Sequence, residues 1–281
     1  EDPKIKAAVY YEQNAPLRIE EIQIDRPKQG EVLVKIAASG VCHSDLSVIN
    51  GNLPFPPPPA VLGHEGAGIV EEVSNDVTSV QPGDHVNLSW RPSCRRCGYC
   101  VTGRPQLCQT AGMEIMTGFL LDGTSRLHKN GTAIRHFTSV SSFAEYAVVP
   151  ESGIVKIRSD VPLEAAALVG CGVMTGVGAA INTAKVEPGA SAVVIGCGGV
   201  GLNTVQGAVL AGAEKIIAVD LNPKKLELAK QFGATHCVNP KDGDPVNQVL
   251  ALTDGLGADY AFEVIGRADG RAGVQFDSAR W

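Results

Sequence analysis

Four cysteines lie within one short stretch of the chain, Cys94, Cys97, Cys100 and Cys108. Four thiolates complete the tetrahedral shell of one Zn2+ and leave no open coordination position, which is the pattern of a structural zinc site. Disulfides or chance clustering are the alternatives, but nothing else in the chain is typical of a secreted protein. The spacing therefore predicts a lobe over residues 93–108 that is closed by a structural zinc.

Size and charge limit the remaining possibilities. The chain has 281 residues, of which 44% are hydrophobic, and a net charge of −6. This length suggests about two domains, each with its own core. The acidic balance disfavours nucleic acid as a partner, and no apolar run is expected to approach the roughly 20 residues of a membrane span. We expect a soluble cytoplasmic protein, where thiols stay available for metal.

The chain changes character near its middle. The first 150 residues alternate short β-rich runs with turns, at 7–10, 32–38, 68–73, 85–88 and 144–149. This pattern predicts a mostly antiparallel β domain. Strands and helices then alternate, at 192–195, 202–211, 216–219, 223–232, 246–252 and 260–264. That series implies a parallel sheet with helices on both faces. We place the boundary near Gly172, giving domains 1–172 and 173–281.

The second domain carries a glycine-rich turn between a predicted strand and a predicted helix. Its residues are Gly196, Cys197, Gly198, Gly199, Val200 and Gly201. In a dinucleotide-binding turn the first glycine permits the tight turn, the second lets the pyrophosphate approach the backbone, and the third lets helix and strand pack closely. Asp220 ends the next strand, where a carboxylate accepts hydrogen bonds from ribose hydroxyls and favours NAD over NADP. The alternative is a plain glycine turn and a helix-capping aspartate.

The first domain mixes further metal-ligand side chains. Cys42 opens the run Cys42-His43-Ser44-Asp45, His64 and Glu65 lie in Gly63-His64-Glu65-Gly66, and Cys171 stands at the proposed junction. Cys42, His64 and Cys171 would hold one zinc and leave a position for substrate, a set used by alcohol dehydrogenases. Taken singly, each is more often a buried thiol or a core histidine.

These motifs together resemble those of the zinc-dependent alcohol dehydrogenases of the medium-chain dehydrogenase/reductase family, from about residue 4 to residue 280. The matching segments are 63–68, the four-cysteine lobe, 122–126, 170–172, 182–189 and 198–201. The resemblance implies an α/β fold, with a GroES-like, mostly antiparallel β catalytic domain followed by a Rossmann-type dinucleotide domain.

The same resemblance implies site roles. Cys42, His64 and Cys171 would hold the catalytic zinc and the lobe cysteines the structural one, about two zinc ions per chain. The alcohol would react as a zinc alkoxide and pass a hydride to NAD. Asp45 would orient His64, and Glu65 would lie behind the metal.

Further roles are implied residue by residue. Ser44 would take the alcohol proton, and Ser47 stands where animal liver-type enzymes have a histidine that ends this proton relay. The cofactor contacts would be His43 on the pyrophosphate, Thr175 and Val200 at the nicotinamide, and Lys225 and Arg267 near the adenosine.

The substrate prediction depends on departures from the glutathione-dependent formaldehyde dehydrogenase branch. Gly112 replaces its arginine, and Leu53 and Phe55 replace its acidic loop residues. Burying a glutathione carboxylate without a cation is costly. We therefore expect an apolar primary alcohol, aryl or allylic, with Trp90 as one pocket wall. A thiol-adduct formaldehyde dehydrogenase, of the S-hydroxymethylglutathione or mycothiol type, is the alternative.

The family also implies roughly a further quarter of sequence beyond Trp281. We therefore expect a C-terminally truncated fragment that ends in a helix over 268–280 and binds NAD poorly, from a parent that is a homodimer or homotetramer. An inactive zinc- or dinucleotide-binding fragment is a second alternative. A zinc-free quinone or enoyl reductase is a third, but that branch lacks both cysteine sets.

Overall fold

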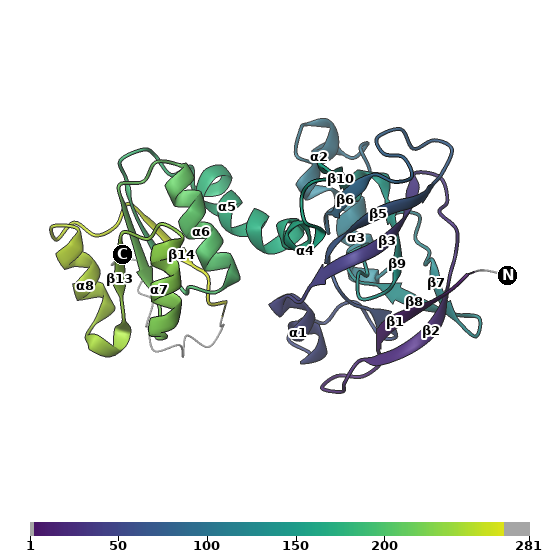
Figure 1. Ribbon diagram of the computed structural model, residues 1–281, viewed down its shortest axis with the longest axis horizontal. Helices are drawn as coiled ribbons and strands as arrows, with labels where there is room; N and C mark the ends of the chain where they lie inside the picture. The colour runs from purple at the N-terminus through teal and green to yellow at the C-terminus, as the bar shows by residue number, and fades with distance from the viewer. Residues whose placement is uncertain (1–2, 267–281) are drawn as a thin grey trace. The chain divides into compact units, whose positions relative to one another are not determined.

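A closed barrel and a five-stranded sheet form the first part of the protein. The computed structural model describes residues 3–266 and divides the chain into two compact units, Glu1–Cys171 and Gly172–Trp281. The barrel has the strand order β1-β2-β7-β8-β4 (Figure 1). Its strands are β1 (Lys4–Tyr10), β2 (Arg18–Ile24), β4 (Ala60–Val61), β7 (Leu127–Lys129) and β8 (Thr132–His136). Its pairs are antiparallel except that between β4 and β8.

The five-stranded sheet has the order β10-β6-β5-β3-β9 and is antiparallel throughout. Its strands are β3 (Glu31–Gly40), β5 (Glu65–Val73), β6 (His85–Leu88), β9 (Tyr146–Pro150) and β10 (Ile154–Lys156). The α-helices among the described residues of this unit are α1 (His43–Ile49), α2 (Gly98–Val101), α3 (Gln109–Thr117) and α4 (Leu163–Leu168). Alternate residues of β3, β6 and β9 pack into one valine-rich core, as period-two burial requires.

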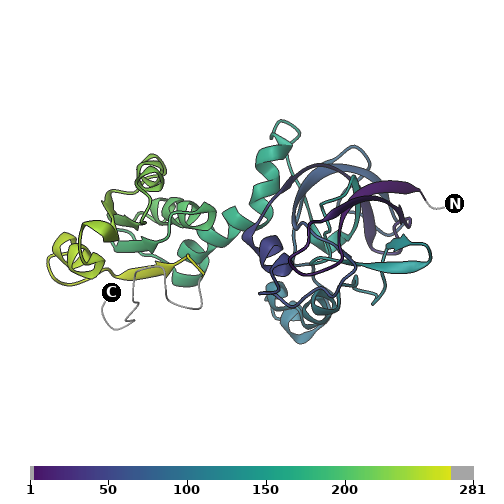
Figure 2. The ribbon, with the colours of Figure 1, turned by 90° about the horizontal axis from the view of Figure 1, so that it is seen from below.

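The second unit is a parallel sheet with helices on both faces (Figures 1 and 2). Its strands are β11 (Ser191–Ile195), β12 (Lys215–Val219), β13 (His236–Val238) and β14 (Tyr260–Glu263), and its helices are α5 (Met174–Gly178), α6 (Gly199–Leu210), α7 (Pro223–Gln231) and α8 (Pro245–Leu252). The order β13-β12-β11-β14 is 3-2-1-4 in chain order, which is the arrangement of a dinucleotide-binding sheet. Helices α6 and α7 cover one face and α8 covers the other.

This architecture confirms the predicted α/β class. Each strand or helix predicted within the described residues has a counterpart, with ends that differ by a few residues. Strands β2, β4, β7, β8, β10 and β13 were not predicted. The predicted helix over 268–280 lies outside the described residues.

One prediction about apolar runs was wrong. A helix continues from Leu163 to Ala184 through two π-type stretches, Val169–Val173 and Ala179–Ala184. It has 22 residues and a mean hydropathy of 1.6, so by length and composition it could cross a membrane. The stretch is rich in alanine, valine and glycine and contains few charged residues, and the helix continues through its glycines. A single helix of this kind is weak evidence for a membrane span, because core helices of globular proteins meet the same criterion.

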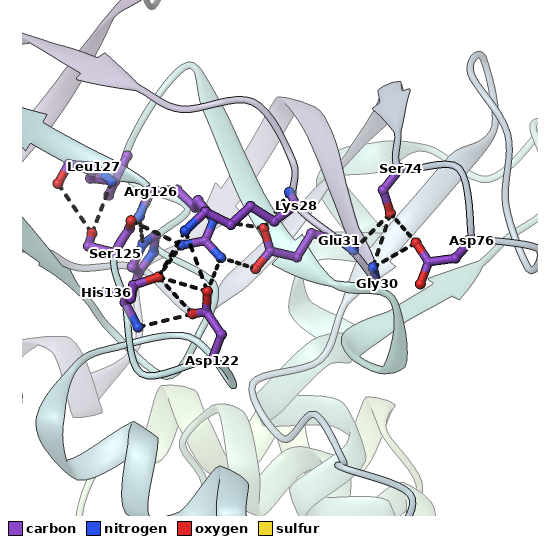
Figure 3. A network of polar contacts seen from close by, with 11 residues as sticks. Lys28, Gly30, Glu31, Ser74, Asp76, Asp122, Ser125, Arg126, Leu127 and His136 are labelled. Atoms are coloured by element: carbon purple, nitrogen blue, oxygen red, sulfur yellow. Dashed lines mark hydrogen bonds and ion pairs between the residues drawn. The ribbon is translucent and has the colours of Figure 1, made fainter.

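A buried ion network joins the start of β3 to the turn before β7 (Figure 3). The Arg126 side chain is fully buried and donates to both carboxylate oxygens of Glu31, at 2.8 and 2.6 Å, and to Asp122 at 2.7 Å. Its backbone N–H donates to Nε2 of His136 at 3.1 Å. Since Nε2 accepts a hydrogen bond, His136 is held as the neutral ring.

His136 makes the first unit sensitive to acid. Burial, reinforced by the positive charges of Arg126 and His128, lowers the pKa of His136 to about 3. The unfolded chain takes up this proton near pH 6.5 and the folded chain only near pH 3. This stabilisation is therefore complete above about pH 6.5 and is lost as the pH falls through that window, by up to ~1.4 kcal/mol per pH unit.

We expect His136→Gln to flatten this slope by one proton in urea unfolding between pH 6.5 and pH 4. His43→Gln, which changes an exposed histidine of the same unit, is the control and should keep the wild-type slope. An unchanged slope in His136→Gln would contradict the assignment.

Candidate functional site

Three predicted ligands and one carboxylate come together in the first unit. One ligand atom from each of Cys42, His64, Glu65 and Cys171 lies within 4.8 Å of the others. Cys42 is the N-cap of α1, His64 directly precedes β5, and Cys171 lies in the π-type stretch after α4. We call Cys42, His64 and Cys171 the Cys2His cluster. Residues far apart in sequence thus meet with the spacing that a single cation requires.

Asp45 links two of these segments. Its carboxylate accepts the Cys42 N–H at 3.1 Å and the Gly63 N–H at 2.9 Å, and it lies 3.4 Å from Nδ1 of His64. Asp45 is only 1% exposed. Because Nδ1 faces this carboxylate, Nε2 is the ring nitrogen left for a metal, as in carboxylate–histidine–metal arrangements. Gly63 is required here, since its φ is +87° and a Cβ would lie 2.5 Å from Phe143.

Charge in the cluster favours thiolate. The hydrogen bond with Cys171 lowers the pKa of Cys42 to about 3, against the effect of burial and with help from His64 and Ser44. Burial acts to lower the pKa of His64, but hydrogen bonds with Asp45 and Cys42 outweigh it and raise this pKa to about 9. Thiolate is the form of cysteine that binds metal, so this environment suits a divalent cation.

Aromatic rings close one side of the cluster. The buried Phe137 ring meets the His64 ring edge-on with centroids 5.2 Å apart, and Phe55 lies 6.4 Å from Phe137. Glu65 occupies a tight position, because a Cβ on Gly40 would come within 2.1 Å of its Oε2. An oxygen of the Glu65 carboxylate lies within 4.8 Å of the ligand atoms of Cys42, His64 and Cys171, so Glu65 is a further candidate ligand, and its place behind the metal stays a prediction.

Ser44, the candidate for the proton relay, and His43, the candidate contact for the cofactor pyrophosphate, lie on the first turn of α1. The Ser44 hydroxyl is 3.7 Å from the Cys42 sulfur, and His43 is exposed.

Trp90, the residue predicted as one pocket wall, is half-buried against the valine-rich core, and no hydrogen-bond partner for its buried indole nitrogen is found among the described residues.

The four lobe cysteines also converge, with ligand atoms within 4.8 Å of one another and all four thiols free. The sulfur of Cys97 lies 3.5 Å from that of Cys100 and 4.0 Å from that of Cys108. Tetrahedral zinc with bonds of about 2.3 Å separates its sulfurs by roughly 3.8 Å, so the cluster fits this ion. Backbone N–H groups, first that of Arg96, lower the pKa of Cys94 to about 6.

The glycine turn of the second unit has the geometry of a phosphate-binding loop. Gly196 has φ +100°, and a Cβ on Gly201 would lie 1.8 Å from the Gly196 carbonyl oxygen. By contrast, a Cβ on Gly198 or Gly199 would meet no atom within 4 Å, so open room lies over the loop at the start of α6. A helix N-terminus with such room suits the pyrophosphate of NAD.

The other cofactor candidates in this unit surround that loop. Asp220 accepts the Cys197 N–H at 2.9 Å, and Lys225 lies 3.9 Å from its carboxylate. Thr175 is exposed on α5, whose neighbouring Gly176 approaches the Val200 carbonyl oxygen so closely that a Cβ would lie 2.4 Å away. Arg267 lies outside the described residues.

Two contributors were not predicted. Asn87 on β6 donates to the Ala166 carbonyl beneath the turn that carries Cys171, and Arg91 brings its guanidinium within about 4 Å of a Cβ built on Gly112. A polar residue inside the predicted strand 85–88 was the one available indication for Asn87.

Fold and site define a two-unit, zinc-type dehydrogenase. The family model for the alcohol dehydrogenase GroES-like domain matches residues 28–159, and that for zinc-binding dehydrogenase matches residues 199–276. The chain belongs to the zinc-type alcohol dehydrogenases of the medium-chain dehydrogenase/reductase family. This confirms the predicted family, the GroES-like and Rossmann-type fold, and zinc and NAD as cofactors.

Individual relatives differ in substrate. The chain is 50% identical to an S-(hydroxymethyl)glutathione dehydrogenase of Synechocystis sp. over 95% of its own length and 72% of that protein. It is 42% identical to the crystal structure of benzyl alcohol dehydrogenase from Acinetobacter calcoaceticus, with a TM-score of 0.88, over 95% of this chain and 72% of that one. A zinc-binding-domain alcohol dehydrogenase from Burkholderia ambifaria matches with a TM-score of 0.90 at 40% identity, covering 96% of this chain and 72% of that chain.

Proposed function

We propose that this protein transfers a hydride between an apolar primary alcohol, aryl or allylic, and NAD. The observation that carries the proposal is the meeting of Cys42, His64 and Cys171, with Asp45 bonded behind the histidine. A zinc held by these three side chains supplies a Lewis acid that lowers the pKa of an alcohol.

The remaining steps belong to this chain's own residues. Asp45 fixes the His64 ring so that Nε2 faces the metal position. Ser44, beside Cys42, accepts the alcohol proton and passes it toward solvent. In the second unit, the glycine turn and the N-terminus of α6 bind the cofactor phosphates, and the Asp220 carboxylate accepts hydrogen bonds from the adenosine ribose.

A second substrate class, a glutathione-type thiol adduct of formaldehyde, is favoured by one specific contact. Arg91 stands beside Gly112, where the sequence alone indicated no cation. Leu53 and Phe55 pack against a core of Tyr10, Val48, Ala60, Leu62 and Phe137, so they are explained without any substrate. The identity to S-(hydroxymethyl)glutathione dehydrogenases adds support for this alternative.

The proposal extends to the cellular compartment and the binding partners of the protein. None of the eight cysteines, all of which lie within the described residues, forms a disulfide, which fits a reducing, cytoplasmic setting. The partners proposed are the small alcohol and aldehyde, with neither nucleic acid nor membrane, and a homodimer or homotetramer of the full-length protein.

One experiment separates the two substrate classes. NADH formation is measured with benzyl alcohol and with S-hydroxymethylglutathione, for the wild type and for Arg91→Ala. A higher kcat/KM for benzyl alcohol, unchanged in Arg91→Ala, supports the apolar alcohol. Preference for the adduct, lost in Arg91→Ala, overturns it in favour of the second class. Zinc content of about two per chain is the accompanying check on the metal sites.

A further inference from the structure

Cys171 is held in the Cys2His cluster by a different part of the structure from Cys42 and His64. Asp45 ties together the segments that carry Cys42 and His64. Cys171 instead stands on the helix that starts at Leu163, so the place of its sulfur depends on how this helix sits on the five-stranded sheet. Small residues bring the two close, because Ala166 and Ala167 of α4 pack directly on Ala67 of β5.

The closest approach is between the helix and β6. A Cβ on Gly170, the residue before Cys171, would lie 2.5 Å from the Leu88 carbonyl oxygen, so backbone lies against backbone here. The Asn87 side chain fills the space alongside, with its Oδ1 3.3 Å from that Cβ position. Its Nδ2 donates to the Ala166 carbonyl, and Asn87 is only 6% exposed.

The bonded carbonyl lies where the helix changes its hydrogen-bond pattern. The regular α4 ends at Leu168, and the π-type stretch Val169–Val173, which includes Cys171, follows. A π-type turn adds a residue to the turn and shifts the direction of the side chains after it, and such turns are frequent at functional sites. The Ala166 carbonyl also accepts the Val169 N–H, so the Asn87 amide supplies a second, fixed donor at this junction.

We infer that Asn87 is a positioning residue for the metal ligand Cys171: its amide holds the Ala166 carbonyl and thereby sets the turn that places the Cys171 sulfur. The inference rests on the proposed metal role of the Cys2His cluster. The contacts of the Asn87 amide are with the helix backbone, at the Ala166 carbonyl and beside Gly170. It acts through the helix backbone, as residues that orient a ligand do, and their loss typically weakens metal binding roughly 10–100-fold.

The test uses Asn87→Ala, which removes the donor, and Asn87→Asp, which sets a carboxylate oxygen against the carbonyl. Each protein is loaded with Co2+ alone, and binding is measured by thiolate-to-cobalt absorption and by competition with a chromophoric chelator. We expect roughly 10–100-fold weaker binding at the Cys2His cluster, larger for Asn87→Asp, with the four-cysteine lobe unaffected. Cys171→Ser gives the reference spectrum for a missing thiolate.

Val86→Ala is the matched control, because Val86 neighbours Asn87 on β6 but is buried in the valine-rich core on the opposite face. Val86→Ala should bind Co2+ at the Cys2His cluster and at the four-cysteine lobe with wild-type affinity. Unchanged binding in both Asn87 variants, or equal losses at the cluster and the lobe, overturns the inference, since equal losses mean a purely structural role. A wild-type protein that binds metal in the lobe alone would overturn the proposed function instead.

Discussion

Cys42→Ala is expected to remove the metal from the Cys2His cluster, lowering zinc content from about two ions per chain to about one. The substitution deletes the sulfur but keeps the backbone N–H that bonds to Asp45, so the local fold should persist. Without Cys42 the cluster has lost one of its two thiolates, and His64, Cys171 and the weaker Glu65 carboxylate should no longer retain zinc through dialysis. Alcohol-dependent NADH formation should therefore fall at least ~10³-fold, since activation of the alcohol is lost.

A buried thiol outside both clusters provides the control. Cys197 is buried, and burial, with the nearby Asp220 charge, raises its pKa to about 12, so it stays a neutral thiol. Cys197→Ala should keep both zinc ions. Zinc content is measured by elemental analysis after dialysis, and rates by NADH absorbance. Two retained ions and a wild-type rate in Cys42→Ala would refute the metal assignment.

The features that could be predicted from the sequence are those whose residues lie close together along the chain. The lobe cysteines lie within 15 residues, so short turns alone bring their sulfurs together, and the interpretation needed no knowledge of the rest of the fold. The glycine turn is also local, because Gly196 and Gly201 meet within a single strand–turn–helix unit. The spacing of the lobe cysteines and the spacing of the glycines in the turn are each required by few other structures.

Strands formed by distant pairing escaped prediction. Strand β4 has two residues and exists because it pairs with β1 on one side and β8 on the other. Strands β7 and β13 have three residues each, and β2 is largely polar with alternate burial. Their own composition is a weak indicator, since side-chain packing against neighbours decides strand formation.

The missed site residues depend on tertiary contacts in the same way. Arg91 approaches Gly112 across a lobe whose internal path the sequence does not reveal, and Asn87 meets Ala166, 79 residues further along the chain. Glu65, which was predicted, has room beside the cluster because Gly40 carries no Cβ; one built there would lie 2.1 Å from Oε2 of Glu65. Spacing identifies residue types that can bind a metal, but packing decides which of them meet.

Arg126→Met is expected to lower the free energy of unfolding of the first unit by about 3–5 kcal/mol, measured by urea unfolding followed by circular dichroism. Met matches the length of the Arg stem, so little packing is lost, but the Glu31 carboxylate, 5% exposed, would lose its two charged donors. Asp122 contributes less because its side chain is 40% exposed. Burial acts to raise the pKa of Asp122, yet Arg126 and Thr124 outweigh it and lower this pKa to about 2.

The chain offers a matched arginine at the surface. Arg158 also makes two bonds to one carboxylate, that of Asp160, at 2.9 and 2.6 Å, but its side chain is 82% exposed. Water already solvates both charges there, so Arg158→Met should cost less than ~1 kcal/mol. If burial is the cause, adding Glu31→Gln to Arg126→Met should recover part of the loss, because the stranded charge is gone. Equal costs for Arg126→Met and Arg158→Met would show that the buried network does not hold β3 to the barrel.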